Sequence, residues 1–308
     1  MNPPVSHVLV TGGAGFIGSH SVEALLAAGI RVTVLDNFSS GKRSNLPARH
    51  PQLVVLEGDI RDPSAVSRAL AGSTHVLHLA AQVSVQASVA DPVNSCHNNV
   101  VGFLNVLDAA RRAGVRRVVY ASSAAVYGTP RTLPLSEDST VAPISPYGLE
   151  KWIDDQYAQL YRDLYGFASL GMRYFNVYGP RQDPSSPYAG VISKFAAALD
   201  SGAPLRIFGD GMQTRDFVFV KDVARINLLA LGADAGGVCN VGTGTSVTLL
   251  ELVEALERAA GQTALRQFEP PATGDIRDSG MSPARLLEWF EEKPATPLSA
   301  GLAALLAG

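Results

Sequence analysis

The chain is most constrained by a glycine-rich turn near its N-terminus, Thr11-Gly12-Gly13-Ala14-Gly15-Phe16-Ile17-Gly18. The turn follows the apolar run His7-Val8-Leu9-Val10 and precedes a helical pattern. Its glycines fit the G-x-G-x-x-G pattern, which allows a tight turn, close approach of the backbone to a pyrophosphate and close packing of helix on strand. The helix N-terminus then offers free N–H groups to phosphates. This arrangement predicts a dinucleotide site.

Asp36 ends the next apolar run, Val32-Thr33-Val34-Leu35. A carboxylate at the end of the second strand can accept hydrogen bonds from both ribose hydroxyls of a dinucleotide, and it would repel a 2′-phosphate. The sequence therefore predicts NAD rather than NADP as the cofactor.

Composition excludes several classes of partner. The net charge is −3 and the chain has no basic run, which argues against nucleic acid and against an anionic membrane surface. No stretch approaches the ~18 apolar residues of a membrane span, and the N-terminus lacks the pattern of a signal peptide. We therefore expect a cytoplasmic protein that binds neither nucleic acid nor membrane.

The cysteines and histidines indicate no metal centre. Cys96 and Cys239 lie far apart without C-x-x-C spacing, so we expect free thiols rather than a disulfide framework or a zinc site. The six histidines are scattered, and the nearest pair, His75 and His78, flanks an apolar strand. The prediction is that the protein holds no metal.

The pattern of apolar runs predicts an α/β fold, a doubly wound (Rossmann) parallel sheet with a smaller C-terminal substrate-binding lobe. Near-continuous apolar strands alternate with amphipathic segments, as in a parallel sheet covered on both faces. Besides the first strand, we predict strands at Val32–Leu35, Leu53–Leu56, His75–Leu79, Arg117–Ala121 and Ser169–Arg173. A helix should begin at Pro92, capped by Asp91, and end at Gly114.

Regularity falls after residue 176, where prolines and glycines break the chain into short elements. A length of 308 residues also favours more than one domain. We expect residues 1–176 to form the NAD-binding domain and residues 177–308 to form mainly the substrate lobe, with some segments returning to the first domain. The Ala/Leu-rich tail Leu298–Leu306 should be a final surface helix.

Two segments carry the chemistry. One is Ala121-Ser122-Ser123-Ala124-Ala125-Val126-Tyr127-Gly128, at the end of the fifth strand, and the other is Tyr147-Gly148-Leu149-Glu150-Lys151. Positions i and i+4 share a helix face, so the Lys151 ammonium can lie beside the Tyr147 phenol. A nearby cation favours the phenolate, which makes Tyr147 a competent base.

With these motifs in this order, the sequence resembles the extended short-chain dehydrogenase/reductase family over nearly its whole length, and within it the NAD-dependent nucleotide-sugar 4-epimerases. Further segments support the resemblance: Gly58-Asp59-Ile60, Leu79-Ala80-Ala81-Gln82, His97-Asn98-Asn99-Val100, Arg173-Tyr174-Phe175-Asn176, residues 209–217 and Gly274-Asp275-Ile276-Arg277.

The resemblance implies the site residues. Ser123, Tyr147 and Lys151 match the catalytic set, with Ser122 as the alternative hydroxyl. Asp59 and Ile60 match residues that hold the adenine, and Ala80 and Ala81 run beside the pyrophosphate. The full set implied for NAD is Gly12, Gly15, Phe16, Ile17, Gly18, Asp36, Asn37, Asp59, Ile60, Leu79, Ala80, Ala81, Gln82, Asn98, Ser122, Tyr147, Lys151 and Tyr174.

A UDP-sugar is the implied substrate. Asn176, Arg215 and Arg277 match positions that hold its diphosphate, and arginine binds phosphate oxygens in pairs. The stretches 189–194 and 205–208 resemble segments that line the uracil and ribose. The implied substrate residues are Ser84, Ser123, Tyr147, Asn176, Ala189, Val191, Lys194, Arg206, Phe208, Arg215, Arg277 and Ser279.

The implied reaction is oxidation at C4 of the hexose, rotation of the 4-keto sugar and reduction on its other face, with no net redox change. Dehydratase relatives have an Asp-Glu pair after the active-site hydroxyl, and decarboxylase relatives have a glutamate there, whereas this chain has Ala124 and Ala125. Methyl groups cannot act as acid and base. A UDP-uronic acid 4-epimerase stays open, as does a non-catalytic NAD-sensing protein, although such sensors generally lack the tyrosine-lysine pair.

Ser279 bears on the choice of sugar. The corresponding position in the family borders the C2 substituent, and a bulky aromatic there leaves room only for a hydroxyl. The small Ser279 therefore implies UDP-N-acetylglucosamine and UDP-N-acetylgalactosamine as the pair interconverted, with UDP-glucose and UDP-galactose also accepted at a lower rate. We also expect a homodimer, by analogy with the family and because the two apolar helices starting at Pro92 and Pro146 can pack as a four-helix interface.

Overall fold

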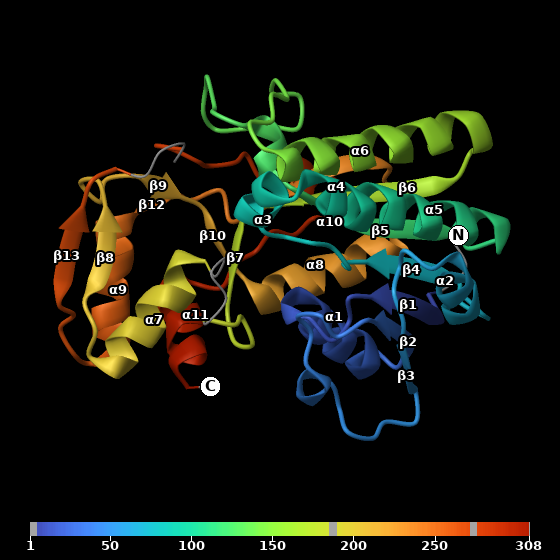
Figure 1. Ribbon diagram of the computed structural model, residues 1–308, viewed down its shortest axis with the longest axis horizontal. Helices are drawn as coiled ribbons and strands as arrows, with labels where there is room; N and C mark the ends of the chain where they lie inside the picture. Colours follow the sequence, from blue (N-terminus) through green and yellow to red (C-terminus); the bar gives the residue numbers. More distant parts are fainter. Residues whose placement is uncertain (1–4, 185–189, 272–275, 308) are drawn as a thin grey trace.

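The computed structural model describes residues 5–184, 190–271 and 276–307. Its larger part is a seven-stranded sheet in which every neighbouring pair is parallel (Figure 1). The strands are β1 (His7–Thr11), β2 (Arg31–Asp36), β3 (Leu53–Glu57), β4 (His75–His78), β5 (Arg117–Ser123), β6 (Ala168–Tyr174) and β11 (Gly237–Val241). The five strands predicted after the first are confirmed to within two residues at each end.

The strand order is β11-β6-β5-β4-β1-β2-β3, so the direction of winding reverses between β1 and β4. Register aligns Val8 with Val32 on one side and with His75 on the other. Parallel strands carry their carboxyl ends at one edge, and ligands of such sheets bind there at the reversal point. The predicted doubly wound Rossmann fold is confirmed, and it places the glycine turn after β1 at this point.

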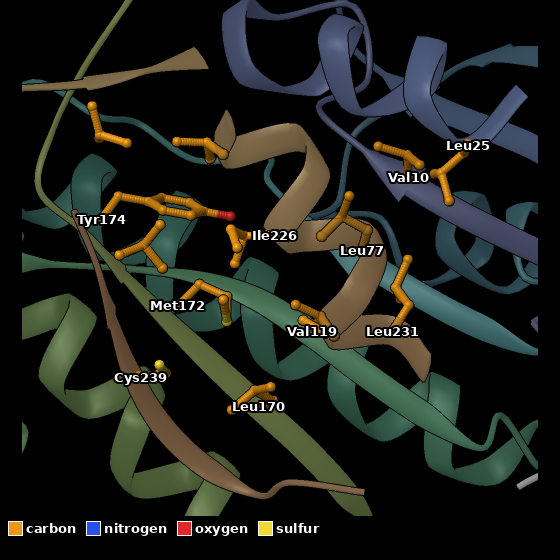
Figure 2. Close-up of a cluster of buried hydrophobic side chains, with 14 of the residues drawn as sticks. Val10, Leu25, Leu77, Val119, Leu170, Met172, Tyr174, Ile226, Leu231 and Cys239 are labelled. Carbon is orange, nitrogen blue, oxygen red and sulfur yellow. The ribbon is translucent and has the colours of Figure 1, made fainter. Parts of the chain in front are cut away.

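Helices cover both faces of the sheet because the strands are apolar on both sides. Side chains of α1 (Phe16–Ala27), α8 (Val220–Gly232) and α10 (Ala284–Phe290) pack in one buried cluster with the sheet. The opposite cluster contains α2 (Pro63–Ala69), α5 (Gly102–Arg112) and α6 (Pro146–Tyr165). Figure 2 shows the first cluster, with Ile226 and Leu231 of α8 lying over Leu77, Val119 and Leu170 of successive strands.

The helix predicted from Pro92 is present, but it is not a continuous α-helix. Asp91 caps it by accepting a hydrogen bond from the Asn94 N–H, and α4 (Pro92–Cys96) leads through a π-helical turn at His97–Val101 into α5. The left-handed Gly114, at φ 72°, follows its end as predicted. A π-turn inserts one extra residue into the helix, so it rotates the side chains beyond it relative to those before it. No spacing in the sequence indicated this change.

In its described residues, the smaller lobe contains three short strand pairs and three helices around its own core (Figure 1). The strands are β7 (Asn176–Tyr178) with β10 (Phe217–Phe219), β8 (Leu205–Phe208) with β13 (Arg266–Glu269), and β9 (Thr214–Arg215) with β12 (Val247–Thr248). The helices are α7 (Val191–Ser201), α9 (Leu249–Ala260) and α11 (Leu298–Leu306). The predicted final helix is therefore confirmed as α11. Within the described ranges, none of the helices combines the length and apolar character needed to cross a membrane.

Candidate active site

The glycine turn brings the backbone of β1 against the segment that follows β4. Gly12 has φ 69°, and a Cβ atom built on it would lie 2.7 Å from the Ala80 nitrogen. Thr11 reinforces the contact, because its hydroxyl accepts hydrogen bonds from the N–H groups of Leu79 (3.2 Å) and Ala80 (3.3 Å). The first turn of α1, beginning at Phe16, has no side-chain cap from any described residue. Its N–H groups can therefore serve an anion.

Asp36 lies beside this turn and is 7% exposed. Its carboxylate accepts hydrogen bonds from the N–H groups of Ala14 and Phe38, each at 2.9 Å. A carboxylate has about four acceptor positions, so two of them remain for ribose hydroxyls. The structure thus places the residue predicted to choose NAD directly at the glycine turn.

Side chains at the ends of β2 and β3 meet at Asp59, which the resemblance implies for the adenine. Asn37 donates to the Asp59 carboxylate at 3.0 Å, and Arg61 forms an ion pair with the same carboxylate at 2.7 Å. The hydrogen bond from Arg61 lowers the pKa of Asp59 to about 2. Ile60, which follows, is 7% exposed. These residues form one wall at the edge of the sheet.

Asn99 and Glu150 support the segment after β4, and the sequence analysis missed both. Asn99 accepts from the Gln82 N–H at 2.8 Å and donates to the Gln82 carbonyl at 2.9 Å. Its amide also donates to the buried Glu150 carboxylate at 2.6 Å. Asn98, the neighbour implied for NAD binding, instead donates to the Asn94 carbonyl at 2.8 Å, so its cofactor contact stays a prediction. The available signal for Asn99 was its place beside Asn98, directly before the apolar pair Val100-Val101.

Ser122 and Ser123 point to opposite sides of β5 because successive strand residues alternate. Ser122 is 2% exposed and lies beside the Asp155 carboxylate of α6. Ser123 is half-buried, and its hydroxyl accepts from the Ala125 N–H at 3.1 Å, which starts a 3-10 turn at Ala124–Tyr127. Of the two hydroxyls, the more accessible one belongs to Ser123.

The predicted Tyr147–Lys151 spacing lies in the first turns of α6. Ser145 caps the helix by accepting from the Gly148 N–H at 3.1 Å. A Cβ atom at Gly148 would lie 2.6 Å from the Ala125 carbonyl oxygen, so glycine lets this turn pack directly on the turn that follows Ser123. The half-buried Tyr147 is thereby brought to the end of β5.

Lys151 is buried, with a side chain that is 2% exposed, and it interacts electrostatically with Tyr147. It also acts on His78 at the end of β4, whose pKa falls to about 3 because of burial first and the Lys151 charge second. The catalytic residues implied by the resemblance therefore gather at the carboxyl ends of β4 and β5.

A buried polar network lies behind this site and links β5, α6 and β6. Arg173 forms an ion pair of 2.9 Å with Asp155 and donates to the Tyr127 hydroxyl at 2.9 Å. The Tyr127 hydroxyl in turn donates to Asn240 of β11 at 2.7 Å. Burial raises the pKa of Asp155, and the Arg173 charge opposes that rise. The network holds the elements that carry Ser123 and Tyr147 in a fixed relation.

Tyr174 and Ser84 have polar groups that are already engaged. The buried Tyr174 hydroxyl donates to Asn227 at 2.7 Å, so a contact with a cofactor would fall to its ring or backbone. Ser84 is 4% exposed, and its hydroxyl caps α3 (Val85–Ala90) by accepting from the Ala87 N–H at 2.9 Å. Their implied binding roles stay predictions.

The implied diphosphate residues lie on the smaller lobe. Arg215 donates to the Arg277 carbonyl at 3.3 Å, which makes these two arginines neighbours. The Arg277 guanidinium pairs with the exposed Asp210 at 2.6 Å. Asn176 donates to the Asp216 carbonyl at 3.1 Å. The two arginines are thus brought together from distant parts of the chain.

The other implied substrate residues surround the same lobe. Arg206 pairs with Glu269 at 2.6 Å, and its guanidinium lies 5.8 Å from the centre of the exposed Phe208 ring. Val191 begins α7, and Lys194 is exposed on it. Ala189 lies outside the described residues. Ser279 is half-buried, and its N–H donates to the Thr214 carbonyl at 3.1 Å, which ties it to β9.

Cysteine and metal chemistry are not evident in the described part of the chain. Cys96 and Cys239 are both free thiols. No group of three or more His, Cys, Asp or Glu side chains among the described residues could hold a metal ion.

Comparison with known proteins identifies the family. Residues 8–242 match the NAD dependent epimerase/dehydratase family. The chain is 43% identical to a UDP-glucose 4-epimerase of Mycolicibacterium smegmatis, over 96% of each chain. It is 41% identical to a putative UDP-glucose 4-epimerase of Methanocaldococcus jannaschii, over 87% of each chain.

Solved structures agree. A UDP-N-acetylglucosamine 4-epimerase from Methanobrevibacter ruminantium is similar at a TM-score of 0.95 and 37% identity, covering 99% of this chain and 98% of that one. A UDP-glucose 4-epimerase from Thermus thermophilus, solved with NAD, has a TM-score of 0.90 and 41% identity, covering 98% of each chain. The family predicted from the motifs is confirmed: the chain belongs to the NAD dependent epimerase/dehydratase family of enzymes, within the extended short-chain dehydrogenases/reductases.

Proposed function

We propose that this protein binds NAD and interconverts the C4 epimers of a UDP-hexose. The observation that carries the proposal is the packing of the first turn of α6, which carries Tyr147 and Lys151, on the turn that follows Ser123 at the carboxyl end of β5. Only β4 separates β5 from β1 and its glycine turn. The backbone at Gly12 leaves no room for a side chain, and α1 offers uncapped N–H groups. These features fit the pyrophosphate of a dinucleotide.

The chain's own residues would move the proton and hold the sugar oxygen. Tyr147, as phenolate, takes the C4 hydroxyl proton, and the positive charge of Lys151 stabilises that phenolate. The accessible Ser123 hydroxyl holds the same oxygen. Bound NAD would supply the acceptor, and then the donor, of the C4 hydride. Tyr147 then returns its proton to the C4 oxygen of the rotated keto sugar, whose C4 carbon is reduced on the opposite face.

The residues after Ser123 support epimerisation over elimination. Ala124 and Ala125 form the 3-10 turn on which the first turn of α6 packs. Their methyl groups offer neither an acid nor a base for chemistry at C5 or C6. Proton transfer in this part of the site therefore falls to Tyr147.

For the sugar, we propose UDP-N-acetylglucosamine and UDP-N-acetylgalactosamine as the main pair, with UDP-glucose and UDP-galactose turned over more slowly. The support is Ser279, a small side chain on the segment that runs beside β9, next to the neighbouring Arg215 and Arg277. A packed bulky residue there would strain an acetamido group by roughly 1–3 kcal/mol. A small residue admits the large sugar without excluding the small one.

The test is direct. The absorbance spectrum of the purified protein should show bound NAD, and incubation with each UDP-sugar followed by chromatographic separation of the C4 epimers should show turnover of both pairs. Turnover of UDP-glucose without UDP-N-acetylglucosamine would overturn the proposed sugar. If the protein is inactive on both sugar pairs but epimerises a UDP-uronic acid, the uronic acid replaces the hexose as the proposed substrate.

We also propose a homodimer joined through α4, α5 and α6. Apolar side chains lie exposed on α4, on the π-helical turn that leads into α5, and on α6: they are Val93 (68%), Val101 (40%), Leu160 (46%) and Leu164 (62%). Leu160 and Leu164 lie one helical turn apart, so they share a face. A patch of this kind marks an association surface, and the replacement of both leucines by glutamate should yield a monomer in sedimentation analysis.

We further propose residues 1–176, together with α8 and β11, as the NAD-binding domain, and most of residues 177–308 as the substrate lobe. The sheet and its packed helices support this division, because β11 pairs with β6. The two free thiols support a cytoplasmic location.

A further inference from the structure

Helix α6 buries four ionisable side chains near the proposed catalytic residues: Glu150, Lys151, Asp154 and Asp155. Two of the three carboxylates, Asp155 and Glu150, have hydrogen-bond partners that give them a structural role. Asp155 uses both carboxylate oxygens, one accepting from the Tyr120 hydroxyl at 3.0 Å and the other from Arg173 at 3.0 Å. The Glu150 carboxylate accepts from Ser95 at 2.8 Å and from Asn99 at 2.6 Å. The remaining carboxylate, Asp154, has a different environment.

The Asp154 side chain is 0% exposed, and one of its oxygens lies 3.1 Å from the Lys151 Nζ. Its other oxygen, Oδ1, is buried with no hydrogen-bond partner among the described residues. The pair is therefore cut off from water, and within the described structure Asp154 has Lys151 as its single hydrogen-bonding partner. Burying a carboxylate with one oxygen unpaired costs free energy of folding. Such a group in a folded protein therefore calls for an explanation in terms of its function.

Burial by itself lowers the pKa of Lys151, and the Asp154 carboxylate is the first among the charges that raise it above its usual value. Burial also raises the pKa of Asp154 to about 7, opposed by the Lys151 charge. Other ionisable groups that face this pair come from α6, α4, β4 and β5, and they are Tyr147, Glu150, Asp155, Cys96, His78 and Tyr120. None of these groups supplies a second cation, because burial keeps His78 neutral and the others are acids. The nearby cation Arg173 is already paired with Asp155.

We infer that Asp154 is a positioning residue of the proposed epimerase: it is the buried counter-ion that keeps Lys151 protonated beside Tyr147. Lys151 lies about one helical turn from Tyr147, whereas Asp154 lies about two turns away, so the cation acts on the phenol more strongly than the carboxylate does. Without Asp154, a fully buried lysine loses its proton at a much lower pH. Tyr147 would then lose the charge that stabilises its phenolate.

The role can be measured in the purified full-length protein with the cofactor it retains. Tyrosine ionisation is followed by ultraviolet difference absorbance during a pH titration. The contribution of Tyr147 is the part of the absorbance change that is lost when Tyr147→Phe is added to the wild type or to the variant under test. In Asp154→Asn this contribution should move to higher pH by about one to three pH units, the effect of one close charge. Asp154→Glu, which restores the charge, should return it toward the wild-type position.

Glu150→Gln is the matched control, because it neutralises a neighbouring buried carboxylate that bonds to Ser95 and Asn99 rather than to Lys151. It should move the Tyr147 contribution far less than Asp154→Asn does, because the hydrogen-bonded partner of Lys151 is Asp154. The inference is overturned if Asp154→Asn leaves that contribution unmoved or moves it to lower pH, or if Glu150→Gln moves it equally. Should Asp154→Asn fail to fold, Asp154→Ser removes the same charge with less volume and carries the same expectation.

The inference rests on the proposed function only for its kinetic consequence. In Asp154→Asn, kcat at neutral pH should fall about tenfold for each pH unit of the phenolate shift, with KM for the UDP-sugar unchanged. A wild-type protein inactive on every UDP-sugar would defeat the proposed function, while the absorbance titration would still decide the role of Asp154.

Discussion

The Asp36 carboxylate accepts a hydrogen bond of 2.9 Å from the Ala14 N–H, and so ties the end of β2 to the glycine turn after β1. Its second oxygen accepts from the Phe38 N–H at 2.9 Å. One side chain thus shapes the turn that is proposed to receive the pyrophosphate and also presents a negative charge where the ribose would lie. These two roles can be separated by mutation.

Asp36→Ala should weaken NAD binding and relax the discrimination against NADP, because both the turn contact and the negative charge are lost. Asp36→Asn keeps an acceptor for Ala14 but removes the charge, so it should relax discrimination with less loss of NAD affinity. Calorimetric titration of both variants with NAD and NADP measures the two effects. Tighter binding of NADP than NAD by the unmodified protein would contradict the role given to Asp36.

Tyr147→Phe should reduce kcat by about 10²- to 10⁴-fold while UDP-sugar affinity is retained, because only the proton-transfer group is removed. Ser123→Ala should cost less, since Tyr147 can still take the proton. Ser122 is buried against Asp155, so Ser122→Ala serves as the comparison. Measurement of kcat for all three variants decides which serine hydroxyl takes part in the reaction. A larger loss of kcat in Ser122→Ala than in Ser123→Ala would exchange the roles of the two hydroxyls.

Ser279→Tyr should suppress turnover of the acetamido sugars far more than turnover of UDP-glucose, because the added ring would fill the space proposed for the C2 substituent. The ratio of kcat/KM for the two sugar pairs, measured by chromatography on wild type and variant, reports the change. Ser246→Ala is a suitable control, since the Ser246 hydroxyl donates to the Ser279 carbonyl at 3.0 Å and, among the described residues, to no other group. Equal losses on both sugar pairs would argue against a specificity role for Ser279.

His78 should make the fold acid-sensitive. Burial lowers its pKa to about 3, from an ordinary value of 6.5. The unfolded chain therefore binds a proton below pH 6.5 that the folded protein does not, and this contribution to stability is lost as pH falls from 6.5 toward 3. Relative to His78→Asn, the wild-type free energy of unfolding should fall by up to about 1.4 kcal/mol per pH unit in that window.

Urea denaturation of wild type and His78→Asn at several pH values gives this difference. His97→Asn, the same substitution at an exposed histidine, is measured alongside as a control. A constant difference between wild type and His78→Asn across the window would show that His78 does not carry the effect.

The repeating apolar runs and the glycine turn were enough to predict the doubly wound sheet, because both are patterns formed by residues close together in sequence. The same holds for the Tyr147–Lys151 pair, since a spacing of four residues sets a shared helix face wherever the helix lies. The final helix Leu298–Leu306 was predictable from the Ala/Leu-rich composition of the segment itself.

Other features depended on contacts between segments distant in sequence. Nothing local distinguishes Asp154 from Asp155, yet folding gives Asp155 the Arg173 guanidinium of β6 and leaves Asp154 with Lys151 alone among its described neighbours. The support of Gln82 by Asn99, and the bond from Asn99 to Glu150 of α6, likewise join segments that are distant in sequence. The sequence by itself determined which chemical groups are present and on which elements they lie; only the tertiary structure decided their partners and burial, because desolvation and charge pairing depend on what surrounds a group in space.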